Sequence, residues 1–347
     1  MSNAADLAHV IFSIVSQIAI NILEGNPMIA GLDLGGTKLA EAIFSDEGEI
    51  FHKDVHELKG REGSGVGAMV GERLEALLAI SGHEVDAVGV SVPGIYFKDH
   101  GSVWAPNIPG WESYPLLSEL QNGAGSKVKV VIDSDRACYI LGEVWQGAAQ
   151  GLRDAIFIAV GTGIGAGIMS DGNVLRGAHD ISGAIGWLAL DRPYLRRYKN
   201  YGCFEYQASG AGIARMACDY LEDDGAYAGV LRSMPPEEIT AKDVFNAYGR
   251  NDGIARQVIR NAVEFWGMAA ANMVSLFDPD KIIFGGGVFG PAADLIGDIR
   301  TEAQKWAQPV SFKKVSMEVS TLKGDAGLYG AGMLALSALK KQEGDNV

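Results

Sequence analysis

The apolar and polar positions of the chain alternate between short strand-like runs and longer helical patterns. Ile29 to Leu34 and Ala87 to Val92 are short apolar runs typical of buried strands, whereas Met69 to Ile80 has helical spacing. The same patterns predict further strands at 39–44, 49–58, 128–132, 155–160, 168–169, 281–284 and 315–319, and helices at 137–145, 208–221, 241–248, 254–276, 291–306 and from 326. Strands interleaved with helices predict an α/β fold.

Both halves of the chain begin with a strand, a glycine turn and a second strand. The first turn contains Gly35, Gly36 and Thr37, and the second is predicted over Gly161 to Gly167. Glycine lets a backbone approach a ligand closely, and successive N–H groups in such a turn bind anions. Each turn alone also fits an ordinary hairpin. Together they predict two similar domains whose turns hold one polyphosphate.

These turns do not match two common nucleotide-binding patterns. The pattern G-x-x-x-x-G-K-[ST] is absent from the sequence. The second turn fits the looser dinucleotide pattern G-x-G-x-x-A, but a strand follows it where that pattern requires a helix. The dinucleotide interpretation is therefore rejected in favour of a phosphate-binding hairpin.

Two aspartates accompany the turns. Asp33 ends the first strand and can hold Mg²⁺ directly or through water. Asp135 lies just past the strand at 128–132, where a carboxylate can accept a proton from an attacking hydroxyl. The alternative for this second position is a helix N-cap, which either Ser134 or Asp135 can supply.

Composition and charge narrow the functional classes. The 347 residues fit two domains of roughly 150 residues each. With 29 basic and 43 acidic residues the net charge is −14, so no nucleic-acid partner is expected. Cys138, Cys203 and Cys218 form no close pair and are interpreted as reduced thiols of a cytoplasmic protein, with a disulfide or metal role as the alternative.

The first 27 residues differ from the rest. Met1 to Ala4 resembles an expression-vector remnant, and His9 to Leu23 is apolar with helical spacing. No Lys or Arg precedes Lys38, and the run is shorter than the ~20 residues that span a membrane, so neither a signal peptide nor a membrane segment is predicted. We expect an appended helix over 1–27, with the main body starting near Met28.

Five motifs in order along the chain resemble the ROK family of sugar kinases and sugar-responsive repressors. The resemblance extends over nearly all of Met28 to Leu339. It rests on Asp33 to Lys38, Ser134-Asp135 followed by Leu141 to Glu143, Gly161 to Gly167, Asp278 to Gly287, and Asp325 to Ala331.

The resemblance implies an actin-like, ribonuclease H-like two-domain ATPase fold with a central cleft for ATP and sugar. The domains would be 28–133 plus about 325–342, and 134–324. It also implies a homodimer in which MgATP donates its γ-phosphoryl group to a sugar hydroxyl, with Asp135 as general base. ATP and Mg²⁺ would be held by Asp33, Gly35, Gly36, Thr37, Lys38, Gly161, Thr162, Gly163, Gly165 and Gly286. Substrate contacts would come from Gly94, Asn107, Ser134, Asp135, Trp187 and Glu205.

The sequence departs from the family on the sugar side. Ala184 to Trp187 replaces the usual Glu-x-Gly-His, Ser134 replaces the usual Asn, and only Cys203 remains of the family's zinc-binding cysteines. A structural zinc site needs four ligands, so we predict no zinc. Each sugar hydroxyl left unpaired costs about 1–3 kcal/mol, which disfavours an ordinary hexose pose. Trp187 either stacks on a sugar face or fills space.

A basic cluster follows Trp187. It suggests an anionic substrate, although a solvated basic loop is the favoured interpretation. The cluster consists of Arg192, Arg196, Arg197 and Lys199.

Three functions compete: a sugar kinase, a sugar-sensing regulator like the family's repressors, and a degenerate homologue that binds ATP without a sugar. Family repressors carry an N-terminal helix-turn-helix domain and have eroded phosphate motifs. Here only 27 residues precede Met28, and the phosphate motifs and Asp135 are intact, which favours the kinase. The altered stretch Ala184 to Trp187 keeps the degenerate homologue as an alternative.

Overall fold

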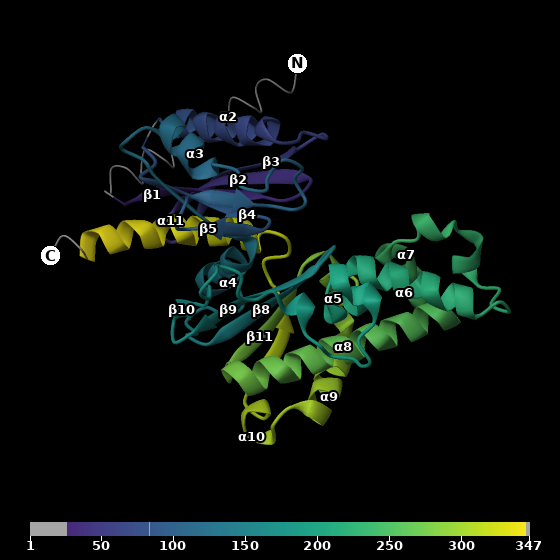
Figure 1. Ribbon diagram of the computed structural model, residues 1–347. Helices are drawn as coiled ribbons and strands as arrows, with labels where there is room; N and C mark the ends of the chain where they lie inside the picture. Colours follow the sequence, from purple (N-terminus) through teal and green to yellow (C-terminus); the bar gives the residue numbers. More distant parts are fainter. Residues whose placement is uncertain (1–25, 83, 345–347) are drawn as a thin grey trace, which may run out of the picture. The chain divides into compact units, whose positions relative to one another are not determined.

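A computed structural model describes residues 26–82 and 84–344 (Figure 1). The chain forms two compact units. The first contains the described residues through Gln150, the segment Arg176–Ile181 and the described residues from Asp325 onward. The second contains Gly151–Leu175 and Ser182–Gly324. The predicted appended helix over 1–27 falls almost entirely outside the described residues.

The first unit is built on a five-stranded sheet in the order β3-β2-β1-β4-β7. β1, β2 and β3 are antiparallel neighbours, while β4 and β7 continue parallel to β1. The strands are β1 (Met28–Leu34), β2 (Lys38–Ser45), β3 (Ile50–Glu57), β4 (Ala87–Val92) and β7 (Lys129–Ser134). The parallel strands read as continuous apolar runs because helices cover both of their faces.

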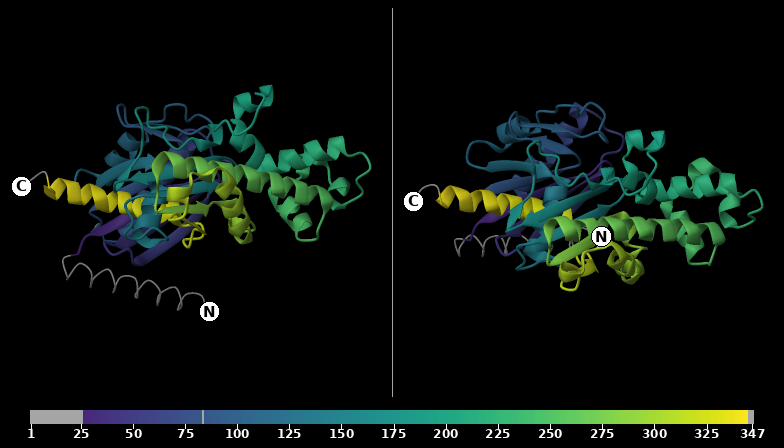
Figure 2. Two further views of the ribbon diagram at one scale, coloured as in Figure 1. Left: turned by 90° about the horizontal axis from the view of Figure 1, so that it is seen from below. Right: turned by 60° about the horizontal axis from the view of Figure 1, so that its bottom comes forward.

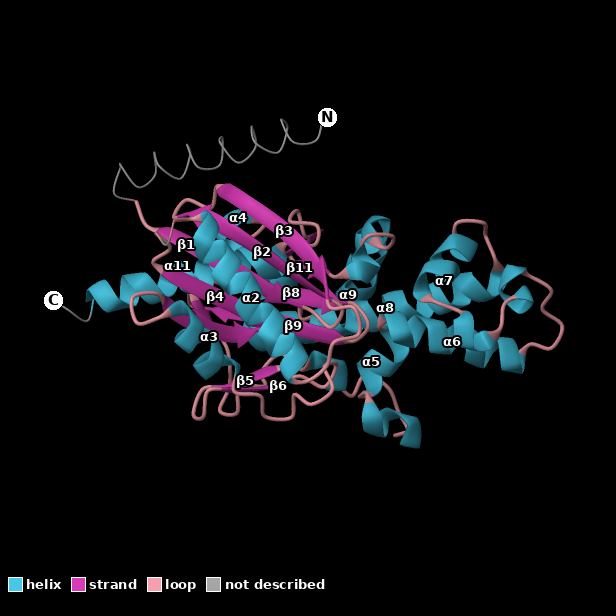
Figure 3. Cartoon of the chain, turned by 90° about the horizontal axis from the view of Figure 1, so that it is seen from above, coloured by secondary structure: helices cyan, strands magenta, loops and turns pink. Residues whose placement is uncertain are grey.

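Two helices pack on each face of this sheet. α2 (Ser64–Ile80) and α3 (Leu116–Ala124) cover one face (Figure 3), and α4 (Asp135–Gln146) packs with α11 (Ala326–Gly344) on the other. α11 lies very close to the strands: a Cβ at Gly89 of β4 would stand 1.9 Å from the carbonyl oxygen of Ala331. Only glycine permits this approach, so the sequence of β4 fixes how α11 seats.

The second unit repeats the topology of the first. Its sheet has the order β10-β9-β8-β11-β12, with β8, β9 and β10 antiparallel and β11 and β12 parallel to β8. The strands are β8 (Ala155–Val160), β9 (Ile164–Ser170), β10 (Asn173–Val174), β11 (Lys281–Gly285) and β12 (Ser316–Val319). The antiparallel hairpins β1–β2 and β8–β9 are the two strand-turn-strand units that the sequence predicted.

Helices dominate the rest of the second unit. α8, the longest, packs against α5, α6, α7 and α9 and is drawn in green in Figure 2. The α-helices are α5 (Cys203–Ala208), α6 (Gly210–Asp223), α7 (Ala241–Tyr248), α8 (Gly253–Phe277), α9 (Ile296–Trp306) and α10 (Pro309–Phe312). The short 3₁₀ turns are η1 (Ile185–Trp187), η2 (Arg196–Asn200), η3 (Val230–Ser233), η4 (Pro236–Glu238), η5 (Gly287–Phe289) and η6 (Ala293–Leu295).

Several predicted elements needed correction. The helix predicted at 208–221 is observed as α6, which begins two residues later, because Ser209 is extended and caps α6 by accepting from the amide of Gly212 at 2.9 Å. The short helix α5 before it was not predicted. The second glycine turn is shorter than predicted, because β9 already begins at Ile164. The helix predicted from 291 begins as an α-helix only at Ile296.

The stretch around Trp104, where the sequence predicted neither a strand nor a helix, contains a small sheet. β5 (Ile95–Phe97) and β6 (Ser102–Trp104) form a small antiparallel hairpin. The following turn is closed by a bond from the amide of Ala105 to the carbonyl of Trp111, whose buried indole donates to the carbonyl of Gly63 at 2.9 Å. This anchoring presents Asn107 at the exposed tip of the turn.

The first unit extends past the predicted domain boundary at 133/134. α4 packs against α11, and its contacts keep the chain in the first unit through Gln150. Within the described residues, no helix is both long enough and apolar enough to cross a bilayer.

Candidate active site

A row of polar side chains lies where three neighbouring strands of the first unit end. The register pairs Asp33 of β1 with Ser91 of β4, and Ser91 with Asp133 of β7. Because β1, β4 and β7 run parallel, their carboxyl ends meet at one edge of the sheet. Asp135, the first residue of α4, follows directly after β7.

Asp33 is half-buried beside the start of α11, where a Cβ on Gly327 would lie 2.5 Å from Oδ2 of Asp33. Burial raises the pKa of the Asp33 carboxyl, and Asp325 adds to the rise, while Ser91 and Lys38 oppose it. Burial disfavours the ionised form of this carboxyl because it removes water, and a nearby cation would stabilise the ionised form.

Asp135 has a carboxylate available for chemistry. Oδ1 accepts from the backbone N–H of Arg136 at 2.8 Å, and the hydroxyl of Tyr139 lies 3.5 Å from Oδ2. Burial raises the pKa of Asp135 to about 6, with Asp33 adding to the rise and Arg136 opposing it. The helix N-cap is Ser134, whose Oγ accepts from the amide of Ala137 at 3.3 Å. The capping alternative therefore applies to Ser134 rather than Asp135.

Two charged partners of this row went unnoticed in the sequence. Asp133 is buried and accepts from Nε of Arg176 at 2.7 Å. Arg136 donates from Nη2 to the carbonyl of Gly94 at 3.3 Å, which ties a predicted substrate residue to the start of α4. The sequence Asp133-Ser134-Asp135 at the end of a buried strand could have indicated these partners. Two acidic side chains placed there need a positive charge nearby.

The first glycine turn closes the β1–β2 hairpin. The amide of Gly35 donates to the carbonyl of Lys38 at 2.8 Å, and the amide of Leu58 donates to the carbonyl of Thr37 at 2.8 Å. Within the described residues, the exposed amides of Gly36 and Thr37 have no acceptor. Asn107 stands beside this turn, with its Cβ 3.4 Å from the position of a Cβ on Gly36. These two amides, rather than that of Gly35, are the ones free to meet an anion.

The second glycine turn holds an acidic side chain. Gly161 donates to the carbonyl of Gly163 at 3.0 Å, and Ile164 donates its amide to Oε2 of Glu205 at 2.8 Å. A Cβ on Gly163 would lie 2.6 Å from the same carboxylate oxygen. Burial raises the pKa of Glu205. Gly163 is thus required for Glu205 to pack against the turn.

The other residues of the second unit that were predicted to bind phosphate lie at the β8–β9 turn, in β9 and after β11. Thr162 is exposed at the tip of the turn, and Gly165 is already inside β9, opposite Ala159. Gly286 follows β11 with φ of 88°, and a Cβ there would lie 2.5 Å from the carbonyl oxygen of Val160. Its close approach to the end of β8 explains the glycine.

Trp187 lies on a loop held by hydrogen bonds. Its side chain is 59% exposed at the end of η1. In the same loop, the buried Tyr198 donates its hydroxyl to Asp191 at 3.1 Å and accepts from Nε2 of Gln207 at 2.9 Å. Gln207 accepts in turn from Nδ2 of Asn261 at 3.2 Å.

The basic cluster of this loop points to solvent. Arg197 pairs with Asp219 at 3.0 Å and lies over the ring of Tyr206 at 5.2 Å. Arg192, Arg196 and Lys199 are exposed. These contacts agree with the solvated loop that the sequence favoured over an anion-binding role.

Comparison with known proteins shows the family. The model of the ROK family matches residues 29–338. The chain belongs to the ROK family. A glucokinase of Halalkalibacterium halodurans is 32% identical over 322 residues, which cover 90% of this chain and 95% of that protein.

A solved structure supports the same assignment, and one relative has a different role. The ROK family glucokinase of Streptomyces griseus, in complex with glucose and AMPPNP, superposes with a TM-score of 0.72 and 29% identity, covering 89% of this chain and 99% of that one. A xylose repressor of Caldicellulosiruptor bescii is 26% identical and covers 89% of this chain but 78% of the repressor. The fold is the actin-like ATPase fold, as the resemblance to the family implied.

Proposed function

We propose that this protein is an ATP-dependent kinase that phosphorylates a hydroxyl of a sugar or sugar derivative, with Asp135 as general base. The observation that carries the proposal is the pair Asp33 and Asp135, two carboxyls with raised pKa at the same edge of the first unit's sheet in a ROK chain. The relatives named glucokinase, and the glucokinase solved with glucose and AMPPNP, support sugar phosphorylation and ATP use.

In the proposed reaction, Asp135 accepts the proton of the sugar hydroxyl while the oxygen of that hydroxyl forms a bond to the γ-phosphorus of ATP. The bond from that phosphorus to the bridging oxygen breaks, and ADP leaves with the electron pair. With a pKa of about 6, Asp135 is mostly ionised at neutral pH. Its pKa is also close enough to neutral pH for it to accept a proton in the transition state.

The first unit also offers groups suited to MgATP. Asp33 is the proposed Mg²⁺ ligand, directly or through water, because a bound cation would stabilise its ionised form, which burial disfavours. The amides of Gly36 and Thr37 are the proposed donors to phosphate oxygens. Bound Mg²⁺ would offset the charge that develops on the phosphates.

The residues predicted to contact sugar remain proposals, and they belong to different units. Gly94, Asn107 and Ser134 belong to the first unit, Trp187 and Glu205 to the second. We also propose that the loop around Trp187 needs no zinc. The hydrogen bonds among Asp191, Tyr198 and Gln207 support this, since they hold the loop by themselves.

The test is ADP release measured over a panel of neutral, amino and acidic sugars. A kinase turns over ATP stoichiometrically with at least one sugar. If the protein turned over ATP with none of them and bound operator DNA in a sugar-dependent way, it would be a regulator like the xylose repressor. ATP binding without sugar-dependent turnover or DNA binding would identify the degenerate homologue.

A further inference from the structure

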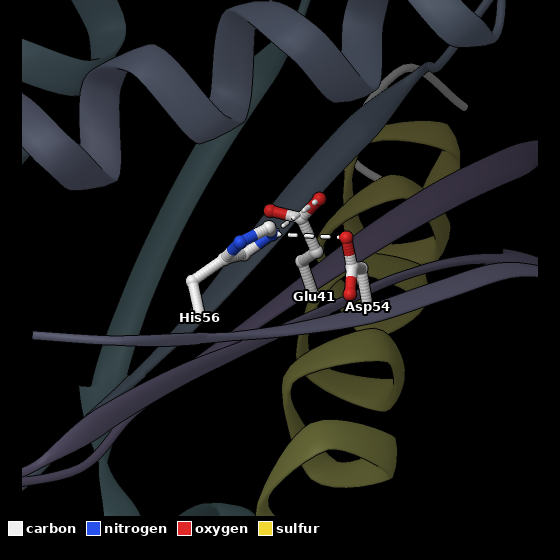
Figure 4. Close-up of side chains that lie close together, drawn as sticks. All are labelled: Glu41, Asp54 and His56. Carbon is white, nitrogen blue, oxygen red and sulfur yellow. Dashed lines mark ion pairs between the residues drawn. The ribbon is translucent and has the colours of Figure 1, made fainter.

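Three potential metal ligands lie together on β2 and β3, apart from the carboxylate row. The register places Glu41 of β2 directly opposite Asp54 of β3. Side chains alternate along a strand, so His56, two residues after Asp54, projects from the same face. Figure 4 shows the three side chains converging.

Their spacing fits one ion. Nε2 of His56 lies 3.4 Å from Oε1 of Glu41 and 3.4 Å from Oδ2 of Asp54. One ligand atom from each of the three residues lies within 4.8 Å of the other two. Zn²⁺ binds nitrogen and oxygen at roughly 2.0–2.2 Å in tetrahedral geometry, which places neighbouring ligand atoms about 3.4 Å apart.

The histidine supplies an observation of its own. Nε2 of His56 is buried and, among the described residues, has no hydrogen-bond partner. The two carboxylate oxygens at 3.4 Å do not meet hydrogen-bond geometry with it, and a buried polar atom without a hydrogen bond is uncommon. An ion at the meeting point of the three side chains would satisfy it.

The surrounding charges leave room for a cation. Glu41 is fully buried, and Arg73 of α2 binds both of its oxygens. Arg73 offsets one of the two carboxylate charges of Glu41 and Asp54, which leaves one negative charge for a cation. Nε2 of His52 lies 3.8 Å from Oε1 of Glu41. Arg73 fixes the orientation of Glu41 and moderates the affinity for a cation. Asp54 is 53% exposed and gives an ion access from solvent.

From this geometry we propose that Glu41, Asp54 and His56 bind one divalent transition-metal ion of the Zn²⁺ type, with water completing the coordination. The imidazole ligand favours Zn²⁺ or Co²⁺ over Mg²⁺, which prefers oxygen ligands alone. The site is therefore chemically distinct from the Mg²⁺ site proposed at Asp33, and it does not depend on the proposed kinase function.

Binding here would act on a segment next to the first glycine turn. β3 ends at Glu57, and the next amide, that of Leu58, donates to the carbonyl of Thr37 in the turn. An ion joining Glu41 to Asp54 and His56 would brace β3 against β2 close to this contact. We therefore expect the bound ion to raise the thermal stability of the protein.

The test is Co²⁺ and Zn²⁺ binding to the purified protein. One Co²⁺ per chain should bind, with the visible d–d bands of tetrahedral Co²⁺, and Zn²⁺ but not excess Mg²⁺ should displace it. Zn²⁺ should also raise the Tm. His56→Ala and Asp54→Asn should each weaken binding by about tenfold to hundredfold or more. Asp54 is exposed, so its variant tests the site even if His56→Ala folds poorly. His100→Ala, which changes an exposed histidine elsewhere, is the matched control.

Two results would overturn the proposal. The first is Co²⁺ binding that His56→Ala and Asp54→Asn leave unchanged. The second is the absence of stoichiometric binding together with an NMR signature of a doubly protonated His56 at neutral pH. That result would make a proton, paired with Glu41 and Asp54, the occupant of the site.

Discussion

The two units position their candidate functional residues in different ways. In the first unit, Asp33, Ser91 and Asp133 are placed by the register of three parallel strands, and Asp135 by the helix that follows. In the second unit, Trp187 lies on an irregular loop whose position depends on Tyr198 and a few hydrogen bonds. Backbone pairing fixes the first set, whereas side-chain packing fixes the second.

This difference suggests that the first unit supplies the residues for phosphoryl transfer and that the loop around Trp187 influences which substrate is bound. The sheet holds the backbone at the strand ends, and burial has already removed water from the carboxyls of Asp33 and Asp135. The loop around Trp187 can change its residues while the sheet stays intact, as the replacement of the family's usual Glu and His suggests. Substitutions in the first unit should therefore alter turnover, and substitutions in the loop should alter substrate affinity or local stability.

A large loss of activity is expected for Asp33→Asn. Removing this charge takes away the proposed Mg²⁺ ligand, and we expect kcat/KM for MgATP to fall about 100-fold or more. Steady-state kinetics over a range of Mg²⁺ concentrations would measure it. Asp46→Asn, which changes a carboxylate on the β2–β3 turn, serves as the control and should retain activity. Equal activity of Asp33→Asn and wild type would remove Asp33 from the mechanism.

The pH profile sharpens the comparison within the first unit. A base whose pKa is about 6 must lose its proton to act, so kcat/KM should rise with pH and reach half its plateau near pH 6. The charge of Asp33 raises the pKa of Asp135, so the residual activity of Asp33→Asn should have its midpoint at lower pH. An unchanged midpoint would show that the two carboxyls are not coupled.

Gly163→Ala tests the second unit. A Cβ there would stand 2.6 Å from Oε2 of Glu205 and displace that carboxylate, so we expect KM for the sugar to rise about tenfold. Gly161→Ala in the same turn is the matched control, since a Cβ at that position meets nothing within 4 Å. Equal changes of the KM for the sugar in both variants would contradict a role of Glu205 in sugar binding.

The smallest effects are expected in the loop. Tyr198→Phe leaves Nε2 of Gln207 without its acceptor and should cost about 1–2 kcal/mol of unfolding free energy. Trp187→Ala changes an exposed side chain and should alter stability by no more than about 0.5 kcal/mol. Denaturant unfolding of both variants measures the contrast. A larger loss for Trp187→Ala would mean that the indole holds the loop.

Much of the sheet architecture could be predicted from the sequence because its strands are continuous apolar runs. β1, β4 and β8 lie where the pattern placed them, and α7 has the predicted bounds. The exact start of α6 could not be predicted, because Ser209 reads as one polar residue in a helical pattern until its cap bond to Gly212 is seen.

The candidate site was predictable to the extent that it follows strand ends. Asp33 and Asp135 come directly after apolar runs, so local pattern suffices to find them. The bond from Ile164 to Glu205 joins residues 41 positions apart, and the pairing of Glu41 with Asp54 depends on the register of β2 and β3. In the sequence, His52, Asp54 and His56 look like the polar face of an ordinary edge strand.

The most direct test of the proposed mechanism is Asp135→Asn, measured for sugar-dependent ADP release at pH 7.5 and for thermal stability. Burial raises the pKa of Asp135, so its charge costs folding stability as the pH rises from 3.8 toward 6 and above. The neutral Asn removes that cost, and the variant should be at least as stable as wild type. We predict that its kcat falls by roughly 10²–10⁴-fold while ATP binding is retained. Sugar-dependent turnover close to that of wild type in a folded Asp135→Asn variant would contradict the assignment of Asp135 as the base.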